Sequence, residues 1–216
     1  MGENTSLVRE RKPRNTLIVE GDDDEHVLYS LLEHYHVPEQ FEVQNKHGIT
    51  KLLSTLDVEL ERSGLERLGI IVDADTDLAS RWQSLKKILH DAGYKNMPAN
   101  PHSGGTIIHE ADRPTVGIWL MPDNALPGML EDFISFLVPS SDVLWPLAEA
   151  ALQQVIAQDR RFPQAHQMKA HIHTWLAWQE EPGKPLGLAI TARYFDADAA
   201  HAQQFMAWIR QLFDLK

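Results

Sequence analysis

A chain of 216 residues with 43% hydrophobic and 24% charged side chains is long enough to bury a sizeable core, as one α/β domain with an appendage or as two small domains. The lack of cysteine excludes disulfides, thiolate nucleophiles and cysteine-bound zinc, and the net charge of −11 argues against broad electrostatic binding of nucleic acid. No apolar run reaches the roughly 18 residues of a membrane span, and the basic N-terminal stretch lacks an apolar segment, so we expect no membrane helix, no secretory signal and a cytoplasmic location.

Short apolar runs alternate with helical periodicity through the first 140 residues. After a loose basic arm at 1–15, the runs predict strands at 16–19, 41–44, 68–72 and 115–121, and a weaker run at 106–109 could form an edge strand. Helices are expected after Asp23 or Asp24 to about 35, after Thr50 to about 62, from 78 to 92 behind the cap Asp77, and from about 129. Because crossovers between parallel strands are right-handed, this order predicts a mainly parallel sheet with helices on both faces.

Beyond residue 140 the pattern is helical only. Amphipathic or alanine-rich stretches predict helices at 143–158, 164–178 and 199–215, with a turn at 182–185. Trp175, Trp178 and Trp208 occupy helical positions that favour a place in the core. We therefore expect a basic arm at 1–15, an α/β domain at 16–140 and a helical extension at 141–216 that packs on it.

Acidic residues follow two of the predicted strands at the point where each strand ends. Glu20 comes directly after the first strand, and Asp24 follows it across a glycine turn. Asp73 and Asp75 come after the strand at 68–72, and their side chains would point the same way along an extended chain. The carboxyl ends of parallel strands meet at one edge of a sheet, where ligands bind. Because clustered carboxylates repel one another, this edge is predicted to bind Mg²⁺ or Mn²⁺.

These residues carry a resemblance to a known family. The pattern Glu20-Gly21-x-x-Asp24 followed by Asp73-x-Asp75, each at a strand end, resembles the Toprim domain of topoisomerases, bacterial primases, small RNA-processing nucleases and OLD-family nucleases. The segments 117–124, 128–132, 169–170 and 175–177 resemble an uncharacterised Toprim-like family related to the OLD nucleases. The resemblance covers roughly residues 15–195.

The resemblance implies a carboxylate cluster that binds Mg²⁺ for cutting or joining phosphodiesters. By position, Glu20 would be a metal ligand or general acid/base, Asp73 and Asp75 metal ligands, and Asp24 a ligand or a support for one. The sequence around Asp73 and Asp75 lacks the glycine that follows in primases and topoisomerases, and no zinc module, topoisomerase tyrosine domain or P-loop is found. Nuclease activity is therefore expected, and not topoisomerase or primase activity. The resemblance also implies a possible partner ATPase, because OLD-like Toprim domains are commonly coupled to one.

Other charged residues admit two interpretations. Asp123, Glu131 and Asp132 follow the strand at 115–121 and could hold a second metal ion, although acids in the first turn of a helix are also common. Lys169 could contact a phosphate or lie on a helix surface. The acids Asp22 and Asp23 are interpreted as helix-start residues, and the basic group containing Arg81, Lys86 and Lys87 as a solvated helix face.

The main functional hypothesis is a Toprim-fold, Mg²⁺-dependent phosphodiesterase that cuts DNA or RNA. The alternative is a non-catalytic Toprim-like module that binds a partner protein or a nucleotide, which the net charge of −11 favours. A third hypothesis is hydrolysis or transfer on a small phosphorylated compound.

Overall fold

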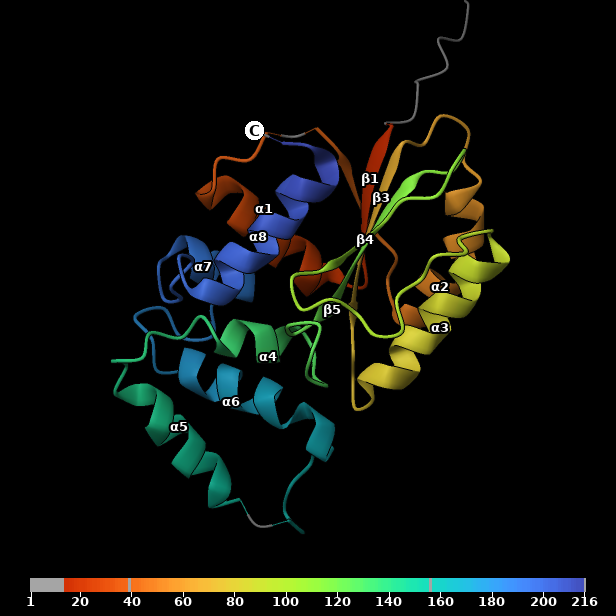
Figure 1. Ribbon diagram of the computed structural model, residues 1–216. Helices are drawn as coiled ribbons and strands as arrows, with labels where there is room; N and C mark the ends of the chain where they lie inside the picture. Colours follow the sequence, from red (N-terminus) through yellow and green to blue (C-terminus); the bar gives the residue numbers. More distant parts are fainter. Residues whose placement is uncertain (1–13, 39, 156, 216) are drawn as a thin grey trace, which may run out of the picture.

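The computed structural model describes residues 14–38, 40–155 and 157–215 and shows a mixed α/β fold around one five-stranded sheet (Figure 1). The strands are β1 (Asn15–Val19), β2 (Glu42–Asn45), β3 (Arg67–Asp73), β4 (Thr106–Ile108) and β5 (Thr115–Met121). They lie in the order β2-β1-β3-β5-β4, and all neighbours are parallel except β4, which pairs antiparallel with β5. The predicted mainly parallel sheet and its edge strand are confirmed.

Eight α-helices are found in the described residues, together with the 3₁₀ helix η1 (Gln164–His166). They are α1 (Asp22–His34), α2 (Ile49–Leu60), α3 (Leu78–Asp91), α4 (Leu130–Ser135), α5 (Leu144–Gln153), α6 (Gln167–Leu176), α7 (Leu186–Thr191) and α8 (Ala200–Phe213). Figure 1 shows α2 and α3 on one face of the sheet and α1 and α8 on the other, as predicted. No helix in the described ranges is long and apolar enough to cross a membrane.

The two faces of the sheet bury separate hydrophobic clusters. Ile70 and Val72 of β3 pack with the side chains of α2 and α3, whereas Ile71 between them packs on the opposite face. This alternation follows from the two-residue period of a strand, and β3 is apolar throughout because both of its faces are covered.

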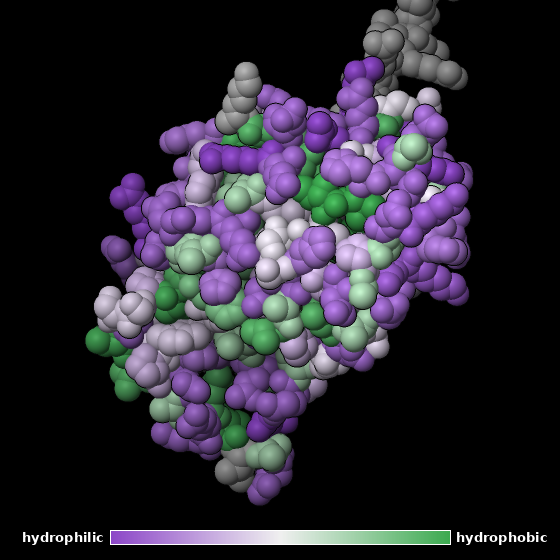
Figure 2. All heavy atoms as spheres, viewed as in Figure 1, coloured by the Kyte–Doolittle hydropathy of each residue, from purple (hydrophilic) through white to green (hydrophobic). Residues whose placement is uncertain are grey.

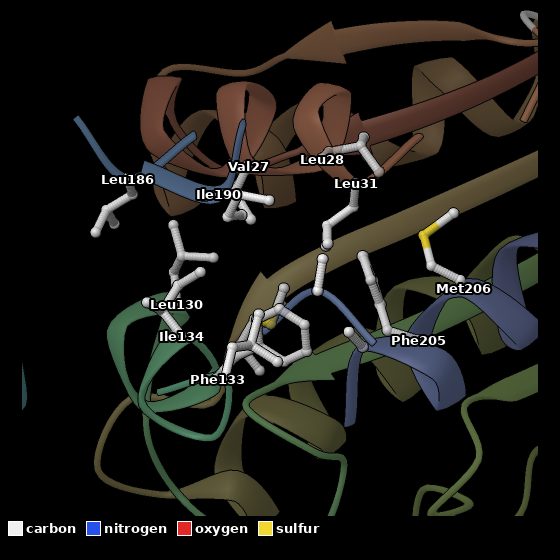
Figure 3. Close-up of a cluster of buried hydrophobic side chains, with 14 of the residues drawn as sticks. Val27, Leu28, Leu31, Leu130, Phe133, Ile134, Leu186, Ile190, Phe205 and Met206 are labelled. Atoms are coloured by element: carbon white, nitrogen blue, oxygen red, sulfur yellow. The ribbon is translucent and has the colours of Figure 1, made fainter. Parts of the chain in front are cut away.

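The larger cluster joins helices from both halves of the chain. Figure 3 shows Val27 and Leu31 of α1 close to Leu130 of α4, Ile190 of α7 and Phe205 of α8. The helices beyond residue 140 therefore share one core with the sheet and α1.

Two strand glycines make this packing tight. A Cβ atom added at Gly117 would lie 2.5 Å from Leu212 of α8, and one at Gly69 would lie 3.1 Å from Leu212 and 2.2 Å from Leu17 of β1. The absence of side chains at these positions lets α8 lie directly on β3 and β5.

Several predicted boundaries are wrong by up to one helical turn. The helix α2 begins at Ile49, and its N-terminal cap is Gly48 (φ 119°), not Thr50, because the chain turns there with a positive φ that glycine tolerates. The helix α1 begins at Asp22 and its N-cap residue is Gly21, not Asp23 or Asp24; Asp24 lies in the first turn and accepts a hydrogen bond from the Gly21 amide. The prediction that Asp77 caps α3 is confirmed by its bond from the Ser80 amide at 2.9 Å.

The predictions beyond residue 140 are less accurate. The helix α5 ends at Gln153, five residues before the predicted end at 158, and α7 lies in a stretch where only a turn was predicted. Trp175 and Trp208 are buried as expected, whereas Trp178 is 43% exposed because α6 already ends at Leu176. The predicted basic arm falls almost wholly outside the described residues, which begin at Arg14.

Most of the viewed surface is polar. Figure 2 shows mainly hydrophilic residues on the viewed face, with hydrophobic residues scattered between them. In the described residues, exposed large apolar side chains include Val58 on α2 and Leu147 on α5. Single exposed apolar side chains of this kind are common on protein surfaces.

Candidate functional site: an acidic cavity at the carboxyl edge of the sheet

A cavity of about 600 Å³ lies where β1 and β3 end and where α1 and α4 begin. Most of its polar lining is acidic, and α6 together with η1 supplies the basic side chains on its wall. The acidic lining residues are Glu20, Asp22, Asp23, Asp24, Asp73, Asp75 and Glu131, and the basic ones are Lys169 and His166. The structure thus brings together the acids that follow the first and third predicted strands.

Glu20 and Asp73 are neighbours because β1 and β3 pair in parallel. The register aligns Ile18 with Ile70, so both strands deliver the residues after their last apolar positions to the same edge. The amide of Asp73 donates to Oε2 of Glu20 at 3.3 Å, and the amide of Leu130 donates to Oδ1 of Asp73 at 3.0 Å. Backbone donors therefore hold these two carboxylates at the cavity.

Asp24 reaches the cavity from the first turn of α1. Its Oδ2 accepts a hydrogen bond from the Gly21 amide at 3.0 Å, which folds the side chain back toward the end of β1. Asp24 is only 8% exposed, and its Oδ1 is buried with no hydrogen-bond partner in the described residues. An ionised oxygen in that position is costly unless a proton or a cation satisfies it.

Burial and mutual repulsion make these three carboxyl groups hold protons tightly. Burial, followed by the charge of Glu20, raises the pKa of Asp24 to about 7. The pKa of Asp73 is raised well above its ordinary value by burial first and then by Asp24 and Glu20. Burial also raises the pKa of Glu20, although the Asp73 amide and the Arg81 charge oppose it. A cation placed among the three would favour their ionised forms.

Asp75 lines the same cavity but already has a cationic partner. It adopts a left-handed backbone conformation (φ 53°) and forms a bridge with Gly128, so the predicted extended run from Asp73 to Asp75 is wrong. Arg81 of α3 donates from Nη2 to Oδ2 of Asp75 and from Nε to the Asp73 carbonyl oxygen, the latter at 2.9 Å. Only 14% of the Arg81 side chain is exposed, so its interpretation as part of a solvated helix face is also wrong.

Glu131 forms the second ion pair of the cavity. It lies in the first turn of α4, is 3% exposed, and contacts Nζ of Lys169 on α6 at 2.7 Å. Burial alone would lower the pKa of Lys169, but the hydrogen bond and charge of Glu131 raise it overall. Lys169 therefore lies at the cavity, as its predicted contact with a phosphate requires, while its ammonium group is bound to a carboxylate.

The structure does not bring Asp123 and Asp132 to the cavity. Oδ1 of Asp123 accepts hydrogen bonds from the amides of Ala125 and Leu126, at 3.0 and 2.8 Å, and closes the turn after β5. Asp132 accepts from the Met129 amide at 2.9 Å, as an acid in the first turn of α4 does. Of the three acids predicted to hold a second metal ion, only Glu131 lines the cavity.

Several residues that line the cavity or contact its acids were not among the predicted site residues. Asp22 and Asp23 do lie at the start of α1, as interpreted, but they also form part of the cavity rim. His166 and Arg81 were not singled out for the site, although Arg81 lies one turn after the cap of a helix that follows a strand-end acid. That position is a usable signal, because the start of such a helix faces the same edge of the sheet.

The side chains of the cavity have the right donor atoms for a divalent metal ion, but their present positions match a metal site only in part. Carboxylate oxygens are the donors that Mg²⁺ and Mn²⁺ prefer, and the unpartnered Oδ1 of Asp24 offers one buried donor. Within the described ranges, however, no three Asp, Glu or His side chains converge closely enough to form a ready-made metal site. Binding an ion would require Glu20, Asp24 and Asp73 to turn toward one another.

A family model described as "Protein of unknown function (DUF3226)" matches residues 14–214. The match includes every residue that lines the acidic cavity. No curated protein and no solved structure matches the chain. The description of the family states no activity.

Proposed function

The chain belongs to the DUF3226 family, and we propose that it is a Toprim-like, Mg²⁺- or Mn²⁺-dependent phosphodiesterase that acts on DNA or RNA. One observation carries the proposal. Two adjacent parallel strands and the helix after the first of them deliver Glu20, Asp73 and Asp24 to one cavity, where none of the three forms a salt bridge in the described residues. Buried charges without partners occur preferentially at functional sites.

The order of elements also supports a Toprim-like arrangement. Glu20 follows β1 directly, Asp73 is the last residue of β3, and the two strands are neighbours in a parallel sheet. The resemblance places its two acidic motifs at such strand ends. A β-strand edge that carries carboxylates from two strands can hold an ion that neither strand could hold alone.

In this proposal Glu20, Asp24 and Asp73 hold the ion. A bound divalent ion supplies Lewis acidity and makes water a stronger nucleophile near neutral pH. Glu20 is the least enclosed of the three carboxylates and could also take a proton from the attacking water. Lys169 lies on the cavity wall with 44% of its side chain exposed, so its charge can reach a phosphate that enters.

The acidic lining has a consequence for substrate binding. A cavity whose lining carries seven acidic residues repels a polyanion unless a cation is bound first. We therefore expect nucleic acid to bind weakly in metal-free buffer and more tightly when Mg²⁺ or Mn²⁺ is present.

Labelled single- and double-stranded DNA and RNA, incubated with Mg²⁺ or Mn²⁺, test the proposal. Glu20→Gln and Asp73→Asn should each lower metal-dependent cleavage about 100-fold or more, because each change removes a proposed ligand or base. Asp123→Asn is the matched control, since it removes one acid outside the cavity. The proposal fails if no metal-dependent cleavage appears, or if it appears equally in all three variants.

A second candidate is a non-catalytic module that binds a partner protein or a nucleotide. The ion pairs of Asp75 with Arg81 and of Glu131 with Lys169 favour it, because they neutralise part of the cavity without an external cation. Calorimetric titration with Mg²⁺ distinguishes the two candidate functions when no binding is observed. If no Mg²⁺ binds, the catalytic proposal is excluded and the binding module is left.

A further inference from the structure

The acids of the cavity fall into two groups that differ in how their charges are compensated. Asp75 and Glu131 each have a cationic side chain of the protein within contact distance, Arg81 and Lys169 respectively. Asp75 is 48% exposed and Glu131 is buried. The buried Asp24 and the partly buried Glu20 and Asp73 accept hydrogen bonds from backbone amides but form no salt bridge in the described residues. Only the acids of the second group therefore need a bound cation to compensate their charge.

The pair of Asp75 and Arg81 is held in place from both sides. Asp77 caps α3 through the Ser80 amide, and this fixes the helical turn from which Arg81 projects. A second bond, from Nε of Arg81 to the Asp73 carbonyl oxygen, prevents the guanidinium group from turning away. On the other side, the bridge to Gly128 fixes the backbone of Asp75. An arginine with two directed hydrogen bonds and little exposure loses less to solvent than a surface ion pair.

Charge counting among the remaining acids points to one ion. Glu20, Asp24 and Asp73 together carry up to three negative charges, and one divalent cation with its waters is enough to compensate most of them. Asp22 and Asp23 are exposed, and Asp22 is engaged by the side-chain amide of Asn45 at 2.6 Å. A second ion beside Asp75 would have to displace Arg81 or share one carboxylate with it.

We propose that this chain binds one divalent cation, held by Glu20, Asp24 and Asp73, and that Arg81 takes the place of a second cation beside Asp75. The proposal rests on the metal site proposed above but not on nuclease activity. Asp75 then holds Arg81 in place and is not a metal ligand, although the sequence motif suggests that Asp73 and Asp75 are both ligands. The fixed guanidinium group supplies positive charge at this wall of the cavity without any metal.

Calorimetric titration of the full chain with MgCl₂ and MnCl₂, without nucleic acid, tests the number of ions. The expected stoichiometry is one ion per chain. Asp75→Asn should change the dissociation constant by less than about 3-fold, whereas Asp73→Asn or Asp24→Asn should weaken it by about 10-fold or more. Circular dichroism checks that each variant is folded.

A second titration measures whether a variant without Arg81 binds an additional ion. Arg81→Gln keeps a helix-forming side chain but frees Asp75, so a second, weaker ion should bind, and the double change Arg81→Gln with Asp75→Asn should abolish that second event. Lys87→Gln is the matched control, because it removes one positive charge from an exposed position on the same helix and should leave one ion bound.

The outcomes separate the two proposals. Three results would each overturn the proposal that Arg81 takes the place of a second ion. The unaltered chain could bind two ions, or Asp75→Asn could weaken binding as much as Asp73→Asn does. The third such result is an unchanged stoichiometry in Arg81→Gln. The metal-dependent phosphodiesterase would survive any of these. If no ion binds at all, both proposals fall together.

Discussion

Two groups of largely enclosed charged side chains lie near the sheet, and they differ in how many of their charges have a partner of opposite sign. Next to β2, Nζ of Lys46 contacts Glu59 at 2.7 Å, and these two side chains are at most 18% exposed. Arg62, 9% exposed, lies 3.7 Å from Glu59 and 4.0 Å from Glu42, so two cations face two acids. At the carboxyl edge, the buried Asp24 and the partly buried Glu20 and Asp73 lie together without such partners in the described residues. Proteins normally pair buried charges, so the unbalanced group is the better functional candidate.

The comparison predicts opposite effects when one acid of each group loses its charge. Glu59→Gln should lower the free energy of unfolding by about 3 kcal/mol, because it leaves the buried charges of Lys46 and Arg62 close together. Chemical denaturation monitored by circular dichroism measures this. The exposed Glu61→Gln at the end of α2 serves as control and should stay within about 0.5 kcal/mol of the unaltered chain. A loss as small as that of the control would show that the Lys46 group does not depend on its balance of charge.

In the cavity, Asp24→Asn should instead stabilise the metal-free protein at pH 8, by about 2 kcal/mol, or roughly 4–8 °C in melting temperature. The change removes the repulsion between Asp24 and Glu20, while the amide oxygen can still accept the bond from Gly21. Asp23→Asn, an exposed neighbour in the same turn, is the control. A lower melting temperature for Asp24→Asn would contradict the idea that this carboxylate is strained without a cation.

The pH dependence of that gain follows from the raised pKa of Asp24. The folded chain holds this proton up to a pKa of about 7, whereas the unfolded chain releases it near 3.8. Folding is therefore progressively weakened by this group as the pH rises from about 4 to 7. The advantage of Asp24→Asn over the unaltered chain should shrink toward zero as the pH is lowered through that window, and Mg²⁺ at pH 8 should stabilise the unaltered chain more than the variant.

The smallest effect is expected for an exposed pair at the start of β1. Arg14 contacts Glu66 at 2.8 Å, but 74% and 51% of the two side chains are exposed. Arg14→Ala should therefore change the free energy of unfolding by at most about 0.5 kcal/mol, and raised salt should remove even that difference. A loss close to that of Glu59→Gln would mean that burial is not what separates the strong from the weak pairs.

Much of the fold could be predicted because its signals are local. The apolar run at 68–72 is β3, the acids after it lie at the predicted edge, and Asp77 caps α3 as its position suggests. The helix α7 was missed because its six residues are too short to show a helical period. It is a helix because it packs on α1, where a Cβ atom at Gly187 would lie 2.7 Å from the His26 carbonyl oxygen.

The sequence by itself determined where the candidate acids lie, because a strand must be apolar to be buried and its end is marked by the first charged residue. Glu20 and Asp73 were identifiable on that ground alone. Only the tertiary structure decided which acids have partners, because ion pairs depend on distances in space: Glu131 meets Lys169 from a different helix, and Asp75 meets Arg81 after the chain leaves the extended conformation. That division of the acids, and not their number, determines what the cavity can bind.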